Sequence, residues 1–499
     1  MRHYSLGLFP LSLALLSGAL LPLSLSPFDW WPIAILSTAC LYFLCQKKSG
    51  MPLFFLCTCF GIGLYGSGVS WVYVSIHDYG NASALLATLL TSLFVIALAV
   101  IFALPLMLLG LFRDAPPASM LFAFPAAWVI GEWTRTWFLT GFPWLNTGYA
   151  LTDTWLAGWA PLLGVLSLSG LIAFCGAFIN LLAKYTQHSS LLQKAGILLG
   201  ITCAMGFASQ TTNWTLPAGK PLHVALIQPV LPVLEKWQGD QLETTLANFQ
   251  KINNTLRYQD LIVWPEAAIP TFRKNIPDFF DTTNAQLSKH QTGVITGIPT
   301  LISSKDRYQY QNSVIGLGAA SGTYSKRRLV PFGEYVPLEH WLRGTIDFFN
   351  LPMSAFSPGL AQQNLLQLGS LKIATAICYE IAYPDLIAGD AGDAQLLLTV
   401  SNDTWFGRSL GPHQHQQIAR MRAIENAKPL LRATNDGFTA VINPDGSIAE
   451  QLPRFVPGIL KAEVTPYKGA TPFNRWGSVP IISLSFATII ILLIIRRLR

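Results

Sequence analysis

Eight long apolar runs constrain this 499-residue chain more than any other feature of its sequence. A helix needs roughly 20 mainly apolar residues to cross about 30 Å of hydrocarbon. We therefore expect a polytopic α-helical membrane domain of about eight transmembrane helices. Seven runs precede residue 212 and the eighth lies near the C-terminus: Leu6–Leu25, Trp31–Cys45, Met51–Tyr73, Ser83–Phe112, Pro117–Trp133, Trp155–Leu182, Ala195–Ser209 and Trp476–Ile495.

The distribution of charge divides the chain into three parts. Charged residues make up 12 % of the sequence and hydrophobic residues 51 %, whereas a soluble domain carries about 25 % charge. This composition excludes both a wholly soluble globule and a disordered chain. Between Leu216 and Gly469 no comparable apolar run occurs and charges return at ordinary density. We expect a seven-helix transmembrane domain over residues 1–212, an attached domain over 213–470, and a C-terminal transmembrane helix with a basic tail over 471–499.

The net charge of +7 is explained by the short loops between the apolar runs. Cytoplasmic loops carry an excess of Lys and Arg, so the basic loops place the N-terminus in the cytoplasm and the attached domain on the opposite side. The positive charge is thus a topology signal, and we expect no nucleic-acid partner. Nine basic residues fall in the segments assigned to the cytoplasm: Arg2, Lys47, Lys48, Arg113, Lys184, Lys194, Arg496, Arg497 and Arg499.

The attached domain alternates between strand-like and helix-like patterns. Strand-like runs rich in Val, Ile, Leu and Ala alternate with helical patterns, which predicts an α/β layered domain. Such domains place their chemistry at strand ends and in the loops beyond them. The expected strands are 222–228, 260–264, 293–297, 313–317, 371–378, 394–401, 430–434 and 439–443, and the expected helices are 241–256, 277–289 and 413–428.

Three strand ends of this domain carry groups that could act together. Glu266 follows the run Leu-Ile-Val-Trp-Pro, Lys326 follows Tyr-Ser, and Cys378 follows Ala-Thr-Ala-Ile. A thiol nucleophile needs a base and a group that stabilises the oxyanion formed on attack, and these three residues supply both. The spacing fits equally a strand-end glutamate, a surface lysine and a buried, inert cysteine.

The motifs at these positions resemble the Glu-Lys-Cys segments of the nitrilase superfamily, which folds as an αββα sandwich. The runs are W-P-E, Y-x-K-x-x-L-V-P-F-G-E and I-C-Y-E. Together with seven leading spans and one trailing span, they resemble the apolipoprotein N-acyltransferase family of bacterial envelopes. Further matching runs are G-F-P-W-L at 141–145, S-N-D-T-W-F-G at 401–407, G-P-H-Q-H at 411–415, R-M-R at 420–422 and R-A-T-N-D-G at 432–437.

This resemblance implies a role for each residue of the triad. Cys378 would be the nucleophile that takes an acyl chain from a membrane phospholipid as a thioester. Glu266 would be the general base, and Lys326 would stabilise the oxyanion. The acceptor would be the α-amino group of the N-terminal diacylglyceryl-cysteine of apolipoproteins, with ping-pong kinetics. The family also implies the bacterial inner membrane, a catalytic domain on the periplasmic side and no cofactor or metal; we expect a monomer.

The resemblance assigns supporting residues as well. Glu334 would orient the site, and Tyr379 and Glu380 flank the nucleophile at positions needed for activity. Trp237 and Trp144 match tryptophans of the family, and we expect both to contact substrate. A surface charge at Glu334 and simple apolar anchoring at Trp237 are the alternatives.

An apolar segment between residues 341 and 356 independently favours a lipid substrate. Exposed apolar patches mark interaction sites, so this segment, with Phe348 and Phe349 at its centre, is interpreted as a lid that guides acyl chains to Cys378. A packed insertion would have the same composition. Glu132 and Arg135, near the end of the fifth run, would contact lipid headgroups or form a structural ion pair.

Two other functional classes remain open from the sequence. A membrane-tethered amidase or hydrolase of the nitrilase type would form the same thioester and pass it to water. A transporter or structural membrane protein is disfavoured, because ionisable residues at mid-bilayer and internal repeats are not evident in the runs.

Overall fold

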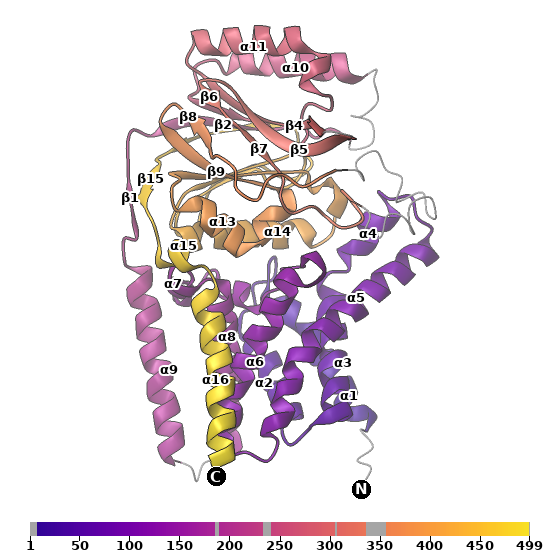
Figure 1. Cartoon of the computed structure of the whole chain (residues 1–499), viewed down its shortest axis with the longest axis vertical. Helices are drawn as coiled ribbons and strands as arrows, with labels where there is room; N and C mark the ends of the chain where they lie inside the picture. Colours follow the sequence, from indigo (N-terminus) through magenta and orange to yellow (C-terminus); the bar gives the residue numbers. More distant parts are fainter. Residues whose placement is uncertain (1–6, 185–188, 233–240, 305–306, 336–355, 499) are drawn as a thin grey trace.

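A computed structural model describes residues 7–184, 189–232, 241–304, 307–335 and 356–498 of the chain. Figure 1 shows a bundle of helices below and layers of sheets and helices above, with both termini at the lower end of the bundle. We call these parts the helical bundle and the α/β domain.

The helical bundle contains the first nine α-helices and the last one. Its packing is close, because glycines let helices approach backbone to backbone; a Cβ at Gly63 would lie 2.0 Å from the Leu15 carbonyl oxygen. The elements are α1 (Leu8–Leu20), η1 (Leu21–Ser24), α2 (Pro32–Cys45), α3 (Gly50–Gly68), α4 (Trp71–His77), α5 (Ala84–Leu106), η2 (Met107–Phe112), α6 (Pro117–Trp137), η3 (Phe138–Thr140), η4 (Thr147–Leu151), η5 (Trp155–Trp159), α7 (Ala160–Leu163), α8 (Val165–Lys184), α9 (Ser189–Gln210) and α16 (Val479–Leu498).

Two of the predicted apolar runs are not single helices. The run 51–73 is divided between α3 and α4, and the run 155–182 is divided among η5, α7 and α8. The second break lies at Gly164, whose φ of +72° favours glycine and whose absent Cβ leaves room for the ring of Phe473. Among the described residues, five helical segments are long and apolar enough to cross a membrane: 50–68, 84–112, 165–184, 190–210 and 479–498.

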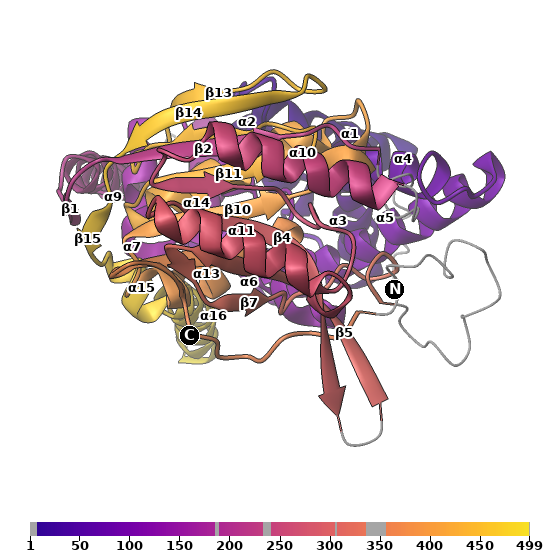
Figure 2. The ribbon, with the colours of Figure 1, turned by 90° about the horizontal axis from the view of Figure 1, so that it is seen from above.

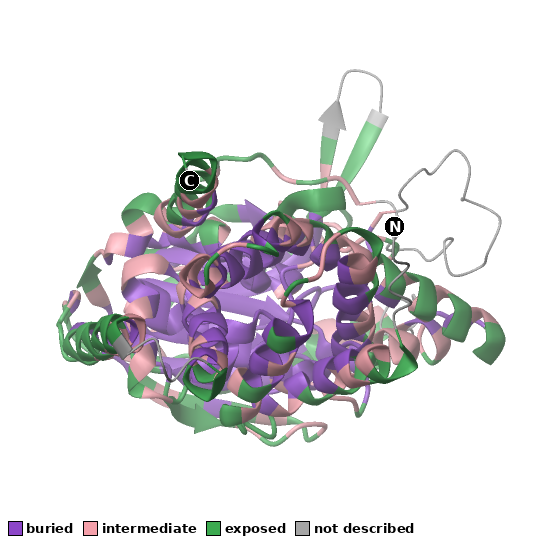
Figure 3. Cartoon of the chain, turned by 90° about the horizontal axis from the view of Figure 1, so that it is seen from below, coloured by how far each residue is buried: buried purple, intermediate pink, exposed green. Residues whose placement is uncertain are grey.

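The outer faces of α9 and α16 expose large apolar side chains that water would not favour. Figure 3 shows both helices as mostly exposed, while the centre of the bundle is buried. A contiguous surface of this kind marks contact with lipid or another protein, which fits a membrane protein. The exposed residues include Ile197, Ile201 and Phe207 on α9, and Ile490, Ile491 and Ile494 on α16.

The α/β domain contains two large stacked sheets between two layers of helices, as Figures 1 and 2 show, and a separate two-stranded sheet of β1 and β15. One sheet has the order β14-β2-β3-β4-β5-β7 and is covered by α10 and α11; the other has the order β13-β12-β11-β10-β9-β8-β6 and is covered by α13 and α14. The αββα sandwich expected from the sequence is therefore present. The bounds are β1 (Thr215–Pro217), β2 (Leu222–Gln228), α10 (Leu242–Thr255), β3 (Leu261–Val263), η8 (Arg273–Asn275), α11 (Pro277–Lys289), β4 (Gly293–Ser304), β5 (Arg307–Gly318), β6 (Ala320–Ser321), β7 (Thr323–Ser325), β8 (Leu366–Leu368), β9 (Leu371–Ile377), η10 (Cys378–Ala382), α13 (Pro384–Ala391), β10 (Leu396–Ser401), η11 (Asp403–Phe406), α14 (Gly411–Asn426), β11 (Leu430–Thr434), β12 (Ala440–Ile442), β13 (Ile448–Gln451), β14 (Gly458–Val464), β15 (Tyr467–Gly469) and α15 (Pro472–Trp476).

The side chains of β9 alternate between two apolar cores, one on each face of its sheet. Ile373 and Ile377 point into the core between the two sheets, while Ala374 and Ala376 face the opposite side. That opposite side belongs to one continuous apolar core that includes α13, α14 and the helical bundle. The lower helix layer of the α/β domain is thus packed between a sheet and the bundle.

The strand pair β4–β5 is longer than the sequence predicts. The expected strands 293–297 and 313–317 extend to Ser304 and from Arg307, and in Figure 2 this hairpin projects from the body of the domain. The extension lacks the apolar alternation of a buried strand, because Tyr308 and Tyr310 are exposed. The apolar pattern of the sequence therefore predicts only the buried part of each strand.

Candidate active site

Cys378 lies where β9 ends and η10 begins. Its φ of +54° is in the left-handed region, which is costly for a side chain other than glycine and is found where a structure requires an unusual turn. The turn lifts the residue out of the strand, and Cys378 is partly exposed although Ile377 and Tyr379 on either side are buried. Burial of an inert cysteine would not need this backbone, so the geometry favours a thiol presented for reaction.

Glu266, Lys326 and Glu334 form a buried charge cluster on the neighbouring strand ends. The Nζ atom of Lys326 lies 2.9 Å from Oε1 of Glu334 and 3.4 Å from Oε1 of Glu266. The exposed fractions of Lys326 and Glu266 are 1 % and 7 %. Glu334 is equally buried, so it is not a surface charge.

Asn312 on β5 bonds both carboxylates and was not predicted. Its Nδ2 donates to Oε1 of Glu266 at 2.7 Å and to Oε1 of Glu334 at 2.9 Å. The second oxygens accept backbone N–H groups, from Asn402 to Glu266 at 2.9 Å and from Val330 to Glu334 at 2.8 Å. Each carboxylate is therefore held at both oxygens. No local motif marks Asn312, because its role depends on two residues that are distant in sequence.

The electrostatic field of this cluster acts directly on the thiol. Burial and the negative charge of Glu266 raise the pKa of Cys378 to about 12, although Lys326 opposes this shift. Burial alone would lower the pKa of Lys326, but Glu334 and Glu266 raise it above its usual range, so the side chain is a permanent cation. At neutral pH the Cys378 thiol of the resting site is therefore neutral and the Lys326 side chain is charged.

Glu380 holds the turn at Ile377–Tyr379, which carries Cys378 and which we call the nucleophile turn. Its Oε2 accepts from the Ile377 amide at 2.9 Å and from the Tyr324 hydroxyl at 2.9 Å. Its Oε1 accepts from the amides of Arg327 and Arg328 at 2.6 and 3.0 Å. One fully buried carboxylate thus ties the strand that carries Cys378 to the segment that follows Lys326.

Tyr379 connects the nucleophile turn to the helical bundle. Its hydroxyl donates to the Gly141 carbonyl at 3.0 Å. Its ring stacks on Trp144 at 6.4 Å between centroids and 17° between planes, and on Phe142 at 6.4 Å and 28°. Residues 141–145, the run that resembles the family in sequence, therefore pack beneath Tyr379. We call this run the floor of the site. Trp144 is 1 % exposed, which places it in this packing.

Glu132 and Arg135 hold that floor in place from within α6. Both are buried, which excludes the headgroup contact considered from the sequence. Glu132 accepts from the amide and hydroxyl of Thr147, each at 2.8 Å. Arg135 donates to the Trp144 carbonyl at 2.7 Å and to Oδ1 of Asn146 at 3.2 Å. Two buried charges thus satisfy the polar backbone of a loop that has no regular partner.

Helix α14 carries further polar groups near the site, Gln414 and His415, from the run 411–415 that resembles the family but to which the sequence assigns no role. Gln414 accepts from the indole N–H of Trp144 at 2.7 Å and of Trp71 at 3.2 Å, and it donates to the Gly68 carbonyl at 2.9 Å. His415 bonds the carbonyl of Cys378. The helix has polar residues on every face and is nevertheless buried almost all round, which only the structure shows.

Three predicted substrate contacts cannot be placed. Trp237, Phe348 and Phe349 lie outside the described residues, as does most of the predicted lid. Their assignment stays a prediction.

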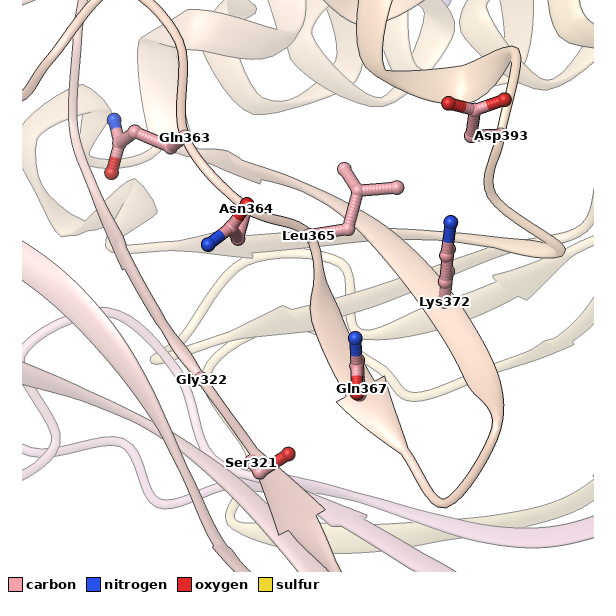
Figure 4. Close-up of a pocket in the computed structure, with 8 residues that line it drawn as sticks. All are labelled: Ser321, Gly322, Gln363, Asn364, Leu365, Gln367, Lys372 and Asp393. Carbon is pink, nitrogen blue, oxygen red and sulfur yellow. The ribbon is translucent and has the colours of Figure 1, made fainter.

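A polar hollow lies away from this site. Its volume is about 520 Å³, and Figure 4 shows its polar lining, with Lys372 and Asp393 on the right, Gln367 below them and Gln363 at the upper left. Lys372 is near the start of β9 and Cys378 follows its end, a separation of about 20 Å along a strand. Among the described residues, no group of three or more His, Cys, Asp or Glu side chains is arranged to bind a metal ion.

Comparisons with known proteins agree with both parts of the chain. Residues 17–178 match the model of the apolipoprotein N-acyltransferase N-terminal domain, and residues 223–471 match the carbon-nitrogen hydrolase model. The crystal structure of Saccharomyces cerevisiae Nit3, a member of branch 10 of the nitrilase superfamily, is 18 % identical, covers 50 % of this chain and has a TM-score of 0.38.

Full-length relatives carry the name of one bacterial family. The apolipoprotein N-acyltransferase of Pseudomonas putida is 44 % identical over 94 % of this chain and 93 % of its own length. The enzyme of the same name from Pseudomonas aeruginosa is 44 % identical over 98 % and 96 %, and that of Vibrio cholerae is 40 % identical over 93 % of both chains. Because identity at this level extends over both the helical bundle and the α/β domain, the chain belongs to the apolipoprotein N-acyltransferase family.

Proposed function

We propose that this protein transfers an acyl chain from a membrane phospholipid to the α-amino group of the N-terminal diacylglyceryl-cysteine of apolipoproteins. Family membership supports the overall reaction. The observation that carries the mechanism is that the charges of a buried glutamate and a buried lysine act on the Cys378 thiol, and that the next residue, Tyr379, packs against the helical bundle.

Acylation begins with a proton transfer inside the site. Glu266 takes the thiol proton of Cys378, and the thiolate attacks an ester carbonyl of the phospholipid. Lys326 stabilises the negative charge that develops on the carbonyl oxygen. When the C–O bond breaks, the proton on Glu266 passes to the departing lysophospholipid alkoxide, and the acyl chain remains on Cys378 as a thioester.

The second half of the reaction uses the same groups. The α-amino group of the acceptor attacks the thioester, and Glu266 accepts the proton that the nitrogen loses. The C–S bond breaks, the Cys378 thiol is restored with that proton, and the product is an amide. The two substrates use one site in turn, so the kinetics are ping-pong.

Several residues would support this chemistry. Glu334 shares Lys326 and Asn312 with Glu266 and so keeps both groups in place. We assign Trp144 to the floor of the site, and Tyr379 and Glu380 to the nucleophile turn. We further propose that Trp237 and a lid containing Phe348 and Phe349 contact the acyl chains.

Topology follows from the loop charges. We propose eight membrane crossings, an inner-membrane location and an α/β domain over residues 213–470 on the periplasmic side, with a monomer as the working unit. The breaks between α3 and α4 and between α7 and α8 are compatible with eight crossings. At each break the chain stays at the same end of the bundle until the next long helix begins.

Product analysis tests transfer against hydrolysis. The purified full chain would be incubated with phosphatidylethanolamine vesicles and a synthetic diacylglyceryl-cysteine peptide. The proposal predicts an N-acylated peptide of the corresponding mass. Release of free fatty acid with the peptide unmodified would instead identify a membrane-tethered hydrolase.

A further inference from the structure

A second buried network, separate from the Glu266–Lys326–Glu334 cluster, holds the backbone of Cys378, and two of its members, Ser401 and Asp403, also act on the pKa of the thiol. The imidazole Nε2 of His415 is 3.1 Å from the Cys378 carbonyl oxygen, and Nδ1 is 3.0 Å from Oδ1 of Asp403. Asp403 accepts from Arg432 at 2.7 Å and from the hydroxyl of Ser401 at 2.7 Å. All four of the residues other than Cys378 are fully or almost fully buried.

The partners of His415 fix the position of its proton. A backbone carbonyl only accepts hydrogen bonds, so Nε2 must carry a hydrogen to bond Cys378. Nδ1 faces both the Asp403 carboxylate and a guanidinium nitrogen of Arg432 at 3.1 Å. Whether or not Nδ1 is protonated, it therefore has a partner, and Nε2 keeps its hydrogen in either case.

Aromatic rings and a closely packed backbone hold this network in place. The ring of His415 packs against Trp144 and Phe406, with centroids 5.4 and 5.8 Å away. A Cβ at Gly437 would lie 2.2 Å from Oδ2 of Asp403, so only glycine fits behind the carboxylate. A fixed acceptor and fixed rings leave one orientation for the imidazole.

The Cys378 carbonyl is part of the peptide group that joins Cys378 to Tyr379. In a trans peptide the C=O and N–H groups are coplanar and point in opposite directions. Holding the carbonyl therefore fixes the plane of the whole group, together with the left-handed backbone of Cys378 and the direction of the Tyr379 amide. Loss of this bond would release the Cys378 peptide group from this orientation, whereas the hydrogen bonds of Glu266 and Lys326 do not include His415.

We propose that His415 is a positioning residue for the acyl-transfer reaction: its Nε2–H group holds the Cys378 peptide in the strained conformation that presents the thiol, and the Asp403–Arg432 pair holds the imidazole. This role rests on the function proposed above. It is distinct from the triad because His415 bonds the backbone and not the reacting atoms.

Two substitutions at His415 separate positioning from simple folding. The amide nitrogen of a glutamine extends to about the place of Nε2, whereas that of an asparagine reaches only the place of Nδ1. H415Q therefore keeps a donor for the Cys378 carbonyl and H415N loses it. His413 is two residues earlier on α14 and contacts Phe438, so H413Q is the matched control.

The measurement is the single-turnover rate of Cys378 acylation by phosphatidylethanolamine, followed by the mass of the intact full chain in detergent. We expect about a 100-fold lower rate in H415N, less than about a fivefold loss in H415Q and the wild-type rate in H413Q, with an unchanged apparent KM for phospholipid. Alkylation of the Cys378 peptide by iodoacetamide should slow in H415N alone, which gives a readout that does not require acyl transfer.

The outcomes distinguish this inference from the proposed function. If wild-type protein is not acylated, the proposed function fails. If wild-type and H415N are acylated at the same rate, or if H415Q and H415N lose activity equally, the positioning role is wrong. If H415N does not fold, H415Q still decides: a loss of 100-fold in a folded H415Q protein would overturn the inference.

Discussion

At the scale of single residues, the site is organised around one buried cation shared by two carboxylates. Lys326 bonds Glu334 and Glu266, and Asn312 donates to the same two oxygens. An added thiolate on Cys378 would bring a further negative charge into a region shielded from water. Moving the thiol proton to Glu266 leaves the net charge of the cluster unchanged, which is the least costly way to form the nucleophile there.

Substitutions at Glu266 and Lys326 should move the acidity of Cys378 in opposite directions. Glu266 raises the pKa of Cys378 and Lys326 lowers it, so E266Q should form thiolate at lower pH than wild type and K326M only at higher pH. The measurement is the pH dependence of iodoacetamide alkylation of the Cys378 peptide.

Acylation by phospholipid should fall in both variants. We expect a loss of about 10²- to 10⁴-fold in E266Q, because the base is missing, and of about 10²-fold or more in K326M, because the oxyanion loses its cation. E266Q thus combines a more acidic thiol with a slower reaction. Faster acylation in E266Q would show that thiolate formation, and not proton transfer through Glu266, limits the rate.

The site residues predicted from the sequence are those with local motifs. Glu266, Lys326 and Cys378 each follow a strand in a recognisable run, so they could be named before the structure. Asn312 and His415 could not be assigned a role, because each acts on partners from other strands and helices. Their functions depend on tertiary contacts that no spacing along the chain encodes.

At the scale of elements, α14 joins the α/β domain to the helical bundle. A buried helix is ordinarily apolar all round, yet α14 contains Gln414, Gln417 and Glu425 among its buried residues. Each bonds a backbone or side-chain group of the bundle, as in the bond from the Val165 amide to Glu425 at 2.9 Å. The sequence predicts the helix over 413–428 with Pro412 ahead of it; in the structure Pro412 lies inside the first turn.

Replacing Gln414 with leucine should loosen this junction. The variant leaves the indole N–H groups of Trp71 and Trp144 and the Gly68 carbonyl without their partner, at a cost of about 2 to 4 kcal/mol. We expect a lower unfolding temperature of the detergent-solubilised chain and slower acylation, since Trp144 supports Tyr379.

The control for this variant is Q286L, the same change at an exposed position of α11. It should leave both the unfolding temperature and acylation close to wild type. Equal unfolding temperatures for Q414L and Q286L would show that α14 does not join the two parts as described.

At the scale of the whole molecule, the two parts share one apolar core, although the α/β domain also has cores of its own between its sheets and beneath α10 and α11. One cluster of buried side chains runs from α1 through the bundle to α13 and α14. Composition could divide the chain into apolar and charged stretches, but it could not show that the lower helices of the α/β domain need the bundle to cover them. The eight-run pattern likewise could not show which runs would break, since Gly164 breaks one through its contact with Phe473.

The shared core predicts that the α/β domain does not stand alone. A fragment of residues 213–470 would expose the faces of α13 and α14 that pack on the bundle, and such apolar patches cause aggregation. We expect the fragment to be insoluble or aggregated by size-exclusion chromatography, whereas the full chain in detergent elutes as a single species. A soluble, folded fragment that is acylated at Cys378 would contradict this prediction.

Mass spectrometry after incubation with phospholipid would show whether Cys378 carries the acyl chain. The purified full chain would be mixed with phosphatidylethanolamine, quenched in acid and digested. We expect an acyl mass on the Cys378 peptide that hydroxylamine removes and that is absent in C378A. An unmodified Cys378 peptide in a folded protein that still N-acylates the acceptor peptide would rule out a thioester on Cys378.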